Sequence, residues 1–312
     1  MSTLATAPRR IAPKRMFRIL GSAILLVLLA YLFPRHKVIH ALESIPGSTL
    51  AAALPVYLAL HFLGCFKWHL MVNGAAVQLP ILQSIRCYFS GLFANLFLPS
   101  VIGGDVVMMT LGAARTRKTE GIISGTLASR AIDLAALGLL VSFAIVFFPR
   151  HMNTAGETLM QLTLMVMVGG AALACAIVFA LRRRLRGRAA AYWNAFASAW
   201  RHPGVTLSAL GLSLAMQTGL VALSAWIGAG CGLLLPVRAW LFAWPLAKLS
   251  GFVPVTLAGI GSRELVLPAL LAPFGADPAV SASVGLAWDA VLIAGCLVAG
   301  IIAKAAALAD RR

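Results

Sequence analysis

Charged side chains are scarce in this chain, and acidic ones are the scarcest. Only 11% of the 312 residues are charged and nine are Asp or Glu, whereas 61% are hydrophobic. A soluble domain usually carries about 25% charged and about 45–50% apolar residues. So little polar material cannot cover a globule of this size, which excludes a cytosolic enzyme, a secreted disulfide scaffold and a disordered chain. The composition indicates an integral membrane protein built from helices.

Sequence motifs of catalysis and of metal binding are also missing. The chain has no CxxC pair, no HExxH motif, no Gly-x-Ser-x-Gly elbow and no P-loop. We therefore expect no enzyme activity, no cofactor and no metal ion. The net charge of +17 is typical of nucleic-acid binders, but the basic residues stand in short clusters beside apolar runs. Because such clusters orient membrane proteins, we expect no nucleic-acid partner.

Long apolar runs divide the chain into full spans and two interrupted stretches. The six runs long enough to cross a bilayer with their flanks are residues 17–33, 49–66, 121–148, 159–181, 205–229 and 279–308. The stretches at 81–111 and 240–274 are broken by Gly and Pro. The first run ends without a small-residue cleavage site, so we expect a retained span and not a signal peptide.

The distribution of basic residues predicts the topology. If each interrupted stretch enters and leaves on one side, most of the basic residues fall in cytoplasmic segments, which include 67–80, 112–120 and 182–204. Residues 1–16 are then a basic cytoplasmic N-terminus, and residues 17–312 are a single transmembrane domain. This arrangement predicts a multi-pass protein of the inner (plasma) membrane with both termini in the cytoplasm.

The interrupted stretches share an order of residues that indicates an internal repeat. Each has Pro, then Gly, then an acid, and a span with a second acid follows. Since each half has three crossings, the halves, about residues 17–148 and 159–308, are inverted relative to each other. The predicted fold class is an all-α polytopic bundle with inverted repeats, about six full spans and two re-entrant broken-helix hairpins. The predicted hinges are Pro99, Gly103, Gly104, Pro254, Gly259 and Gly261.

Ionisable side chains within the apolar stretches are the candidate functional residues, because each costs about 2.5–3.5 kcal/mol to insert without a partner or a wet cavity. The candidates for headgroup binding are Arg130, Arg263, Lys248 and Asn95, and those for charge balance or proton coupling are Asp105, Asp133, Glu264 and Asp289. Arg130 and Asp133 share a helical face and can pair. The pair either locks its helix to the neighbouring helices or forms a site for an anionic headgroup or a proton. Lys248 either pairs with an acid or holds a phosphate.

Two adjacent charges begin the second half of an interrupted stretch. We expect Glu264 near a helix start, where the dipole favours an anion, and Arg263 facing a cavity, where its fork suits a phosphate. Gly259 and Gly261 would let backbone N–H groups approach an anion closely.

Three motifs carry a resemblance to a known family. They are LFLPSVIGGDVV at 96–107, SRAIDLAAL at 129–137 and FVPVTLAGIGSRE at 252–264. In this order they resemble the flippase-like membrane domain family, also called the lysylphosphatidylglycerol synthase transmembrane region family, over about residues 20–305. The resemblance implies an inner-membrane protein that moves or handles lipids. The cargoes it implies are anionic or aminoacylated phospholipids, polyprenyl-linked intermediates and hopanoid-type lipids.

The favoured hypothesis is a lipid translocase that moves a polar-headed membrane lipid. A membrane-embedded lipid-modifying enzyme and a scaffold that recruits a soluble lipid synthase stay open as alternatives. We find no counterpart of the family's soluble synthase domain in these residues, so we expect no synthesis of lysyl-lipid. A homo-oligomer also stays open, because Gly121 and Gly125 form a small-residue face that packs within the chain or between chains.

Overall fold

The computed structural model describes residues 31–98, 100–147, 187–250 and 261–310, together with residues 158 and 165. Within these residues every regular element is a helix and there is no strand. The predicted spans at 17–33 and 159–181 lie almost wholly outside the described residues. The same is true of the predicted hinges Pro99, Pro254 and Gly259.

Four helices among the described residues are long enough to cross a membrane. They are α3 (Gly47–Gly74), α6 (Thr119–Phe147), α9 (Pro203–Gly230) and α12 (Pro278–Ala309). At 1.5 Å per residue even the 28-residue α3 is about 42 Å long, which exceeds a hydrocarbon core of about 30 Å. These helices account for four of the six predicted full spans and confirm an all-α polytopic membrane protein.

Among the described residues, four of the helices that are too short to span lie within the interrupted stretches. They are α4 (Ile81–Ala94), α5 (Ser100–Thr116), α10 (Val237–Ser250) and α11 (Ser262–Leu271), the last followed by the 3-10 turn η1 (Ala272–Phe274). A helix of 14 residues, such as α4 or α10, reaches only about 21 Å. They occupy the two stretches that Gly and Pro interrupt in the sequence.

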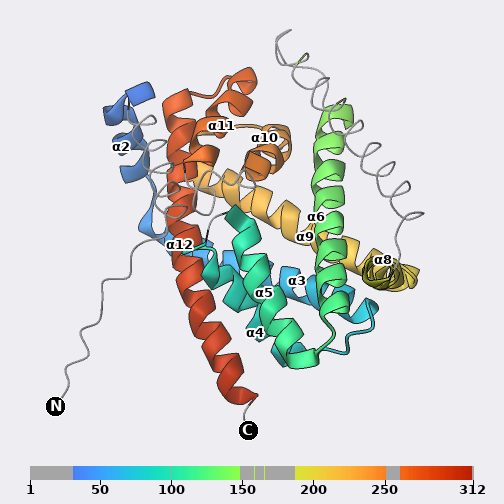
Figure 1. The fold of residues 1–312 in the computed structure, drawn as a ribbon. Helices are drawn as coiled ribbons and strands as arrows, with labels where there is room; N and C mark the ends of the chain where they lie inside the picture. Colours follow the sequence, from blue (N-terminus) through green and yellow to red (C-terminus); the bar gives the residue numbers. More distant parts are fainter. Residues whose placement is uncertain are drawn as a thin grey trace, which may run out of the picture.

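The order of helix lengths repeats along the chain. A long helix, two short ones and a second long helix follow each other as α3–α4–α5–α6 and again as α9–α10–α11–α12. The packing follows the same pattern, since α3 packs on α9, α4 on α12 and α10 on α6. Figure 1 shows α4 and α5 toward the end of the molecule where the C-terminus lies, and α10 and α11 toward the other end.

Each pair of short helices begins and ends on the same side of the molecule. Lys118 Nζ, after α5, donates to the carbonyl oxygen of Ala76, before α4, at 2.8 Å. At the opposite end, the segment around α2 (Arg35–Glu43) joins the end of α9 to the start of α12. Ser44 Oγ donates to Gly230 O at 3.1 Å, and Lys37 pairs with Asp277 at 2.8 Å.

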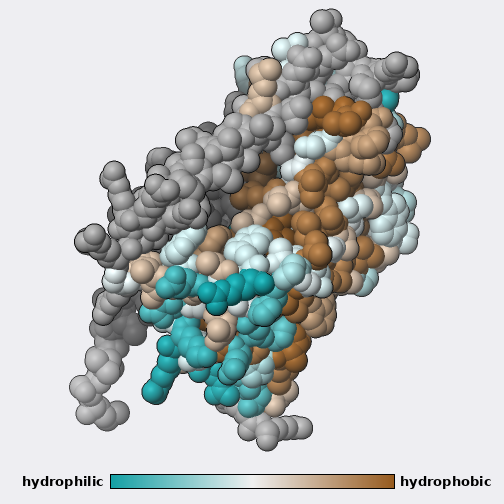
Figure 2. All heavy atoms as spheres, turned by 90° about the vertical axis from the view of Figure 1, so that its right-hand side faces the viewer, coloured by the Kyte–Doolittle hydropathy of each residue, from teal (hydrophilic) through white to brown (hydrophobic). Residues whose placement is uncertain are grey.

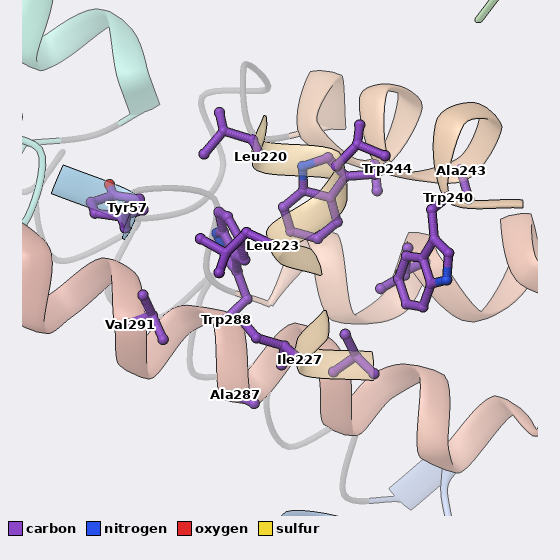
Figure 3. Close-up of a cluster of buried hydrophobic side chains, with 14 of the residues drawn as sticks. Tyr57, Leu220, Leu223, Ile227, Trp240, Ala243, Trp244, Ala287, Trp288 and Val291 are labelled. Atoms are coloured by element: carbon purple, nitrogen blue, oxygen red, sulfur yellow. The ribbon is translucent and has the colours of Figure 1, made fainter. Parts of the chain in front are cut away.

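Small residues allow the helices to approach closely. A Cβ atom on Gly125 of α6 would lie 2.6 Å from Val72 Cα of α3, and one on Gly121 would lie 2.9 Å from Ala75 O. The small-residue face of Gly121 and Gly125 is thus occupied within the chain. Large side chains fill the other half, where Trp244 and Trp288 meet with ring centroids 4.4 Å apart (Figure 3).

The surface separates an apolar band from a polar end. On the face in Figure 2 the hydrophobic side chains lie above, and the hydrophilic ones gather at the end where α5 joins α6. Leu127, Leu134 and Phe147 of α6 are exposed, as expected of a lipid-facing helix. Arg115, Arg117 and Lys118 are exposed at the polar end, and α8 (Arg188–Ala199) packs on α6.

One predicted loop is wrong. The sequence analysis ended a span at Phe66 and placed residues 67–80 in the cytoplasm, but α3 continues to Gly74. The residues after Phe66 hold no helix breaker before Gly74, and Lys67, Trp68, Met71 and Val72 are buried. Lys67 is therefore an interior residue of the bundle and not a loop charge.

Candidate functional site

A cavity of about 170 Å³ lies among the long and the short helices. Six of the eight predicted site residues line it: Asn95, Asp105, Arg130, Asp133, Lys248 and Arg263. Glu264 and Asp289 lie behind Arg263, outside the lining. Leu134, Leu137, Met216 and Leu220 add an apolar wall. The cavity therefore combines charged groups with hydrocarbon surface inside one membrane domain.

Arg130 of α6 is the centre of the first charged cluster. Its Nε donates to Asp105 Oδ2 at 2.8 Å, its Nη2 bonds the other Asp105 oxygen, and its Nη1 lies 3.3 Å from Asp133 Oδ2. Asp105 belongs to α5, so this bidentate pair ties the short helix to the long one. We call Arg130, Asp105, Asp133 and Lys67 the Arg130 cluster.

Lys67 completes this cluster and was missed by the sequence analysis. Its side chain comes from α3, is 3% exposed, and bonds Asp133 Oδ1. Ser213 Oγ of α9 donates to the same oxygen at 2.7 Å. The signal that was available is the unbroken apolar pattern after Lys67, which places the lysine inside a helix. Two cations thus face two carboxylates, and the pairing of Arg130 with Asp133 is one contact of a larger network.

Asn95 and two glycines hold the first pair of short helices together. Asn95 follows α4, and its Oδ1 accepts a hydrogen bond from Gly104 N of α5 at 3.0 Å. The prediction that Gly103 and Gly104 are hinges is wrong, because both lie within the first turns of α5. A side chain on Gly104 would collide with the backbone of Gly91, so the glycine serves close packing of α4 against α5.

Arg263 of α11 is the centre of a second cluster. Its Nη1 donates to Asp289 Oδ1 of α12 at 3.0 Å, and its guanidinium lies 5.5 Å from the ring centre of Trp244. Glu264 accepts a hydrogen bond from Gly261 N at 2.6 Å at the start of α11, as the helix dipole favours. We call Arg263, Glu264 and Asp289 the Arg263 cluster.

The glycine before α11 has a different role from the one expected. Gly261 has φ +92°, a conformation that favours glycine, and it marks the start of the helix as a hinge would. Its N–H group is bonded to Glu264, so it is not free for an external anion.

Lys248 of α10 lies between the two clusters. Its Nζ donates to Gln217 Oε1 at 2.7 Å, and Gln217 Nε2 reaches Asp133 Oδ1 at 3.5 Å. None of the described carboxylates forms an ion pair with Lys248. The expected pairing with an acid is therefore absent from the described residues. Lys248 presents a cation to the cavity that a neutral amide, and no carboxylate, contacts.

Neutral polar groups that the sequence analysis did not select complete the lining. Tyr57 and His61 come from α3 and Tyr88 from α4. His61 Nδ1 and the Tyr88 hydroxyl are 3.2 Å apart, and Tyr57 stacks on His61 with ring centroids at 4.4 Å. Single aromatic and histidine residues in an apolar run carry no periodic signal, so only the fold brings them together.

Comparison with known proteins addresses the family directly. The family model described as the lysylphosphatidylglycerol synthase TM region matches residues 18–300. Searches among curated proteins and among solved structures give no match. The matched range includes both charged clusters and all the described helices except the end of α12. The chain belongs to the lysylphosphatidylglycerol synthase transmembrane region family.

Proposed function

We propose that the protein is a flippase-like lipid translocase that moves a polar-headed membrane lipid between the leaflets of the inner membrane. One observation carries this proposal: Arg130, Lys248 and Arg263 all line a single cavity within the membrane domain. Cations at membrane depth are costly unless they serve a partner or a pathway. Guanidinium groups and the ammonium group of a lysine both bind phosphate well, so the phosphate of a lipid headgroup is a suitable partner.

The proposed route depends on a particular topology. Each pair of short helices would be a re-entrant hairpin, and the two hairpins would enter from opposite faces as inverted repeats. The contacts that join both ends of each pair, through Lys118 and through α2, support this arrangement. The basic turn between α5 and α6 would lie in the cytoplasm with both termini.

The apolar wall of the cavity would guide the acyl chains. Leu134 of α6 lines the cavity and is also 53% exposed on the outer surface of the bundle. The polar site and the lipid-facing surface therefore share a boundary. A headgroup would cross through the cavity while its acyl chains stay in the bilayer beside α6. No covalent step is needed for this activity, so we place the protein outside the enzymes.

Reconstituted vesicles test this proposal. Vesicles with and without the protein would receive a fluorescent phosphatidylglycerol in the outer leaflet, and its protection from dithionite would be followed over time. We expect protection to be faster with protein, and Lys248→Met to slow it roughly tenfold, the loss of about 1.4 kcal/mol. Lys304→Met, the same change at an exposed lysine of α12, is the matched control and should leave the rate unchanged. Equal rates with and without wild-type protein would refute translocation.

A further inference from the structure

Two carboxyl oxygens of the Arg263 cluster lack a hydrogen-bond donor among the described residues. Glu264 is 0% exposed and Asp289 is 5% exposed. Glu264 Oε1 and Asp289 Oδ2 are both buried, and neither receives a hydrogen bond from any described donor. A buried carboxylate oxygen without a donor is costly, so each of these atoms needs a hydrogen that the heavy-atom contacts do not supply.

The same two carboxyl groups face each other. Glu264 packs directly on α12, because a Cβ on Gly285 would lie 2.9 Å from Glu264 Cγ. Asp289 is one turn beyond Gly285 and so lies on the same face of α12. Glu264 and Asp289 are therefore neighbours where α11 packs on α12. Two ionised carboxylates in one buried site repel each other, and a proton between them removes the repulsion and supplies the missing hydrogen bond.

Charge balance connects this proton to the cavity. The two clusters and Lys248 bring together four cations and four carboxyl groups. Their charges sum to zero when all eight groups are ionised and His61 is neutral. These residues are Lys67, Arg130, Lys248, Arg263, Asp105, Asp133, Glu264 and Asp289. One proton on the Glu264–Asp289 pair leaves one positive charge in excess. Among the described residues no carboxylate pairs with Lys248, so the excess lies in the cavity.

We propose that the Glu264–Asp289 pair binds one proton together with each anionic headgroup that enters the cavity, where Lys248 is its counter-charge. This proposal rests on the proposed function and names its ligand as a singly charged phosphate group on a lipid. Binding the proton and the anion together keeps the site neutral, which avoids an unpaired charge at membrane depth. The headgroup therefore crosses as a neutral pair with a proton.

The other charged and titratable groups around the pair are those of the cavity. They are Arg263 on α11, Lys248 on α10, Tyr57 and His61 on α3, Tyr88 on α4 and Cys296 on α12, together with Asp105, Arg130 and Asp133 of the Arg130 cluster. Among them Arg263 contacts Asp289 directly and keeps one negative charge on the pair. Lys37 of α2 faces Asp277 at the rim and not this pair.

Calorimetry in detergent tests the linkage with dihexanoyl phosphatidylglycerol as the probe. Affinity of the wild type should be highest at low pH and fall as the pH rises, by up to about tenfold per pH unit, because binding is linked to one proton. Repeating the titration in buffers of different ionisation enthalpy should show about one proton taken up per lipid. Glu264→Gln, which mimics the protonated pair, should bind with a constant affinity and take up no proton. Asp289→Asn makes the same charge change. It therefore tests the proton site independently if Glu264→Gln fails to fold.

Four outcomes decide between the claims. An affinity of the wild type that does not change with pH, or a pH dependence that survives in both variants, would overturn the proton site. No binding by the wild type at any pH would instead refute the proposed function. Inorganic phosphate is the soluble comparison. We expect it not to compete, and equal binding of phosphate would show that the site takes a free anion and would overturn the lipid assignment.

Discussion

The Arg130 and Arg263 clusters contain similar side chains but differ in the number of cations per carboxyl group. Each pairs an arginine with a carboxylate of a long helix and has a second carboxyl group on a short helix. In the Arg130 cluster a second cation, Lys67, gives two cations for two carboxylates, and Ser213 adds a donor. The Arg263 cluster has one cation for two carboxyl groups, and two of their oxygens lack a described donor. The first is a closed network that holds helices together, whereas the second has room for a proton.

Asp133→Asn should break this comparison most strongly. The variant removes the carboxylate that Lys67 and Arg130 share and leaves Lys67 as a buried, uncompensated cation. Breaking a buried pair by removing one partner costs about 3–5 kcal/mol. The free energy of unfolding, measured by denaturant titration in a fixed detergent, should fall by this amount.

Glu264→Gln is the matched change in the other cluster. Its amide oxygen can still accept from Gly261 N, and its NH₂ group can donate to Asp289 as the shared proton would. We expect a change of about 1 kcal/mol or less in the free energy of unfolding. If this variant were as unstable as Asp133→Asn, the two clusters would be electrostatically alike and the contrast between them would be lost.

Arg263→Met should have the next largest effect. It removes the cation that contacts Asp289, and two buried carboxyl groups then remain without a positive partner. We expect a loss of about 3 kcal/mol in the free energy of unfolding, at the lower end for a broken buried pair because a second proton can neutralise the site. Adding Asp289→Asn in the same chain should restore most of the loss, since the charge left over is then removed. A double variant no more stable than Arg263→Met would show that Arg263 acts by packing on Trp244.

The sequence predicts the charged residues better than it predicts their partners. Arg130 and Asp133 are visible as a pair because they share a helical face. Asp105, 25 residues before Arg130, is tied to it only through the packing of α5 on α6. Lys67 was missed for a related reason, since a lysine at the edge of an apolar run reads as the end of a span. Its burial depends on Asp133, 66 residues further along the chain.

The interrupted stretches were recognised but their details were not. Gly and Pro predict that the stretches at 81–111 and 240–274 are broken, and the structure has two short helices in each. The sequence cannot tell a glycine that bends the chain from one that lets two helices touch. Gly261 bends it, whereas Gly104 lies in a regular helix against Gly91. This distinction depends on the neighbouring helix and not on the local pattern.

Ser213→Ala should weaken the Arg130 cluster without removing a charge. The variant deletes the hydroxyl that donates to Asp133 at 2.7 Å, and a hydrogen bond to a charged group contributes about 1.5–3 kcal/mol. Ser224→Ala is the control on the same helix, because Ser224 Oγ bonds only the carbonyl of Leu220, one turn earlier, among the described residues. We expect Ser224→Ala to change the free energy of unfolding by less than about 0.5 kcal/mol. Equal effects would mean that Ser213 stabilises its own helix and not the cluster.

Asp277→Ala should have a smaller effect than Ser213→Ala, because it acts at the rim of the helix that carries Asp289. Asp277 caps α12 by accepting from Ala279 N at 2.8 Å, and it also pairs with the exposed Lys37. Loss of an N-cap costs about 1 kcal/mol. Asp277→Asn keeps a capping oxygen and loses only an exposed ion pair worth about 0.5 kcal/mol, so it should be closer to wild type.

The pH dependence of this last effect has a definite sign. The ammonium group of Lys37, together with the backbone N–H groups at the start of α12, lowers the pKa of Asp277 below its ordinary value. A carboxyl group with a lowered pKa in the folded protein contributes its stability above its unfolded pKa of about 4 and loses it as the pH falls through the folded value. The difference in unfolding free energy between wild type and Asp277→Ala should therefore be full at neutral pH and shrink in acid. A difference that stayed constant down to low pH would mean that the carboxylate charge of Asp277 contributes nothing and that only the shape of the cap matters.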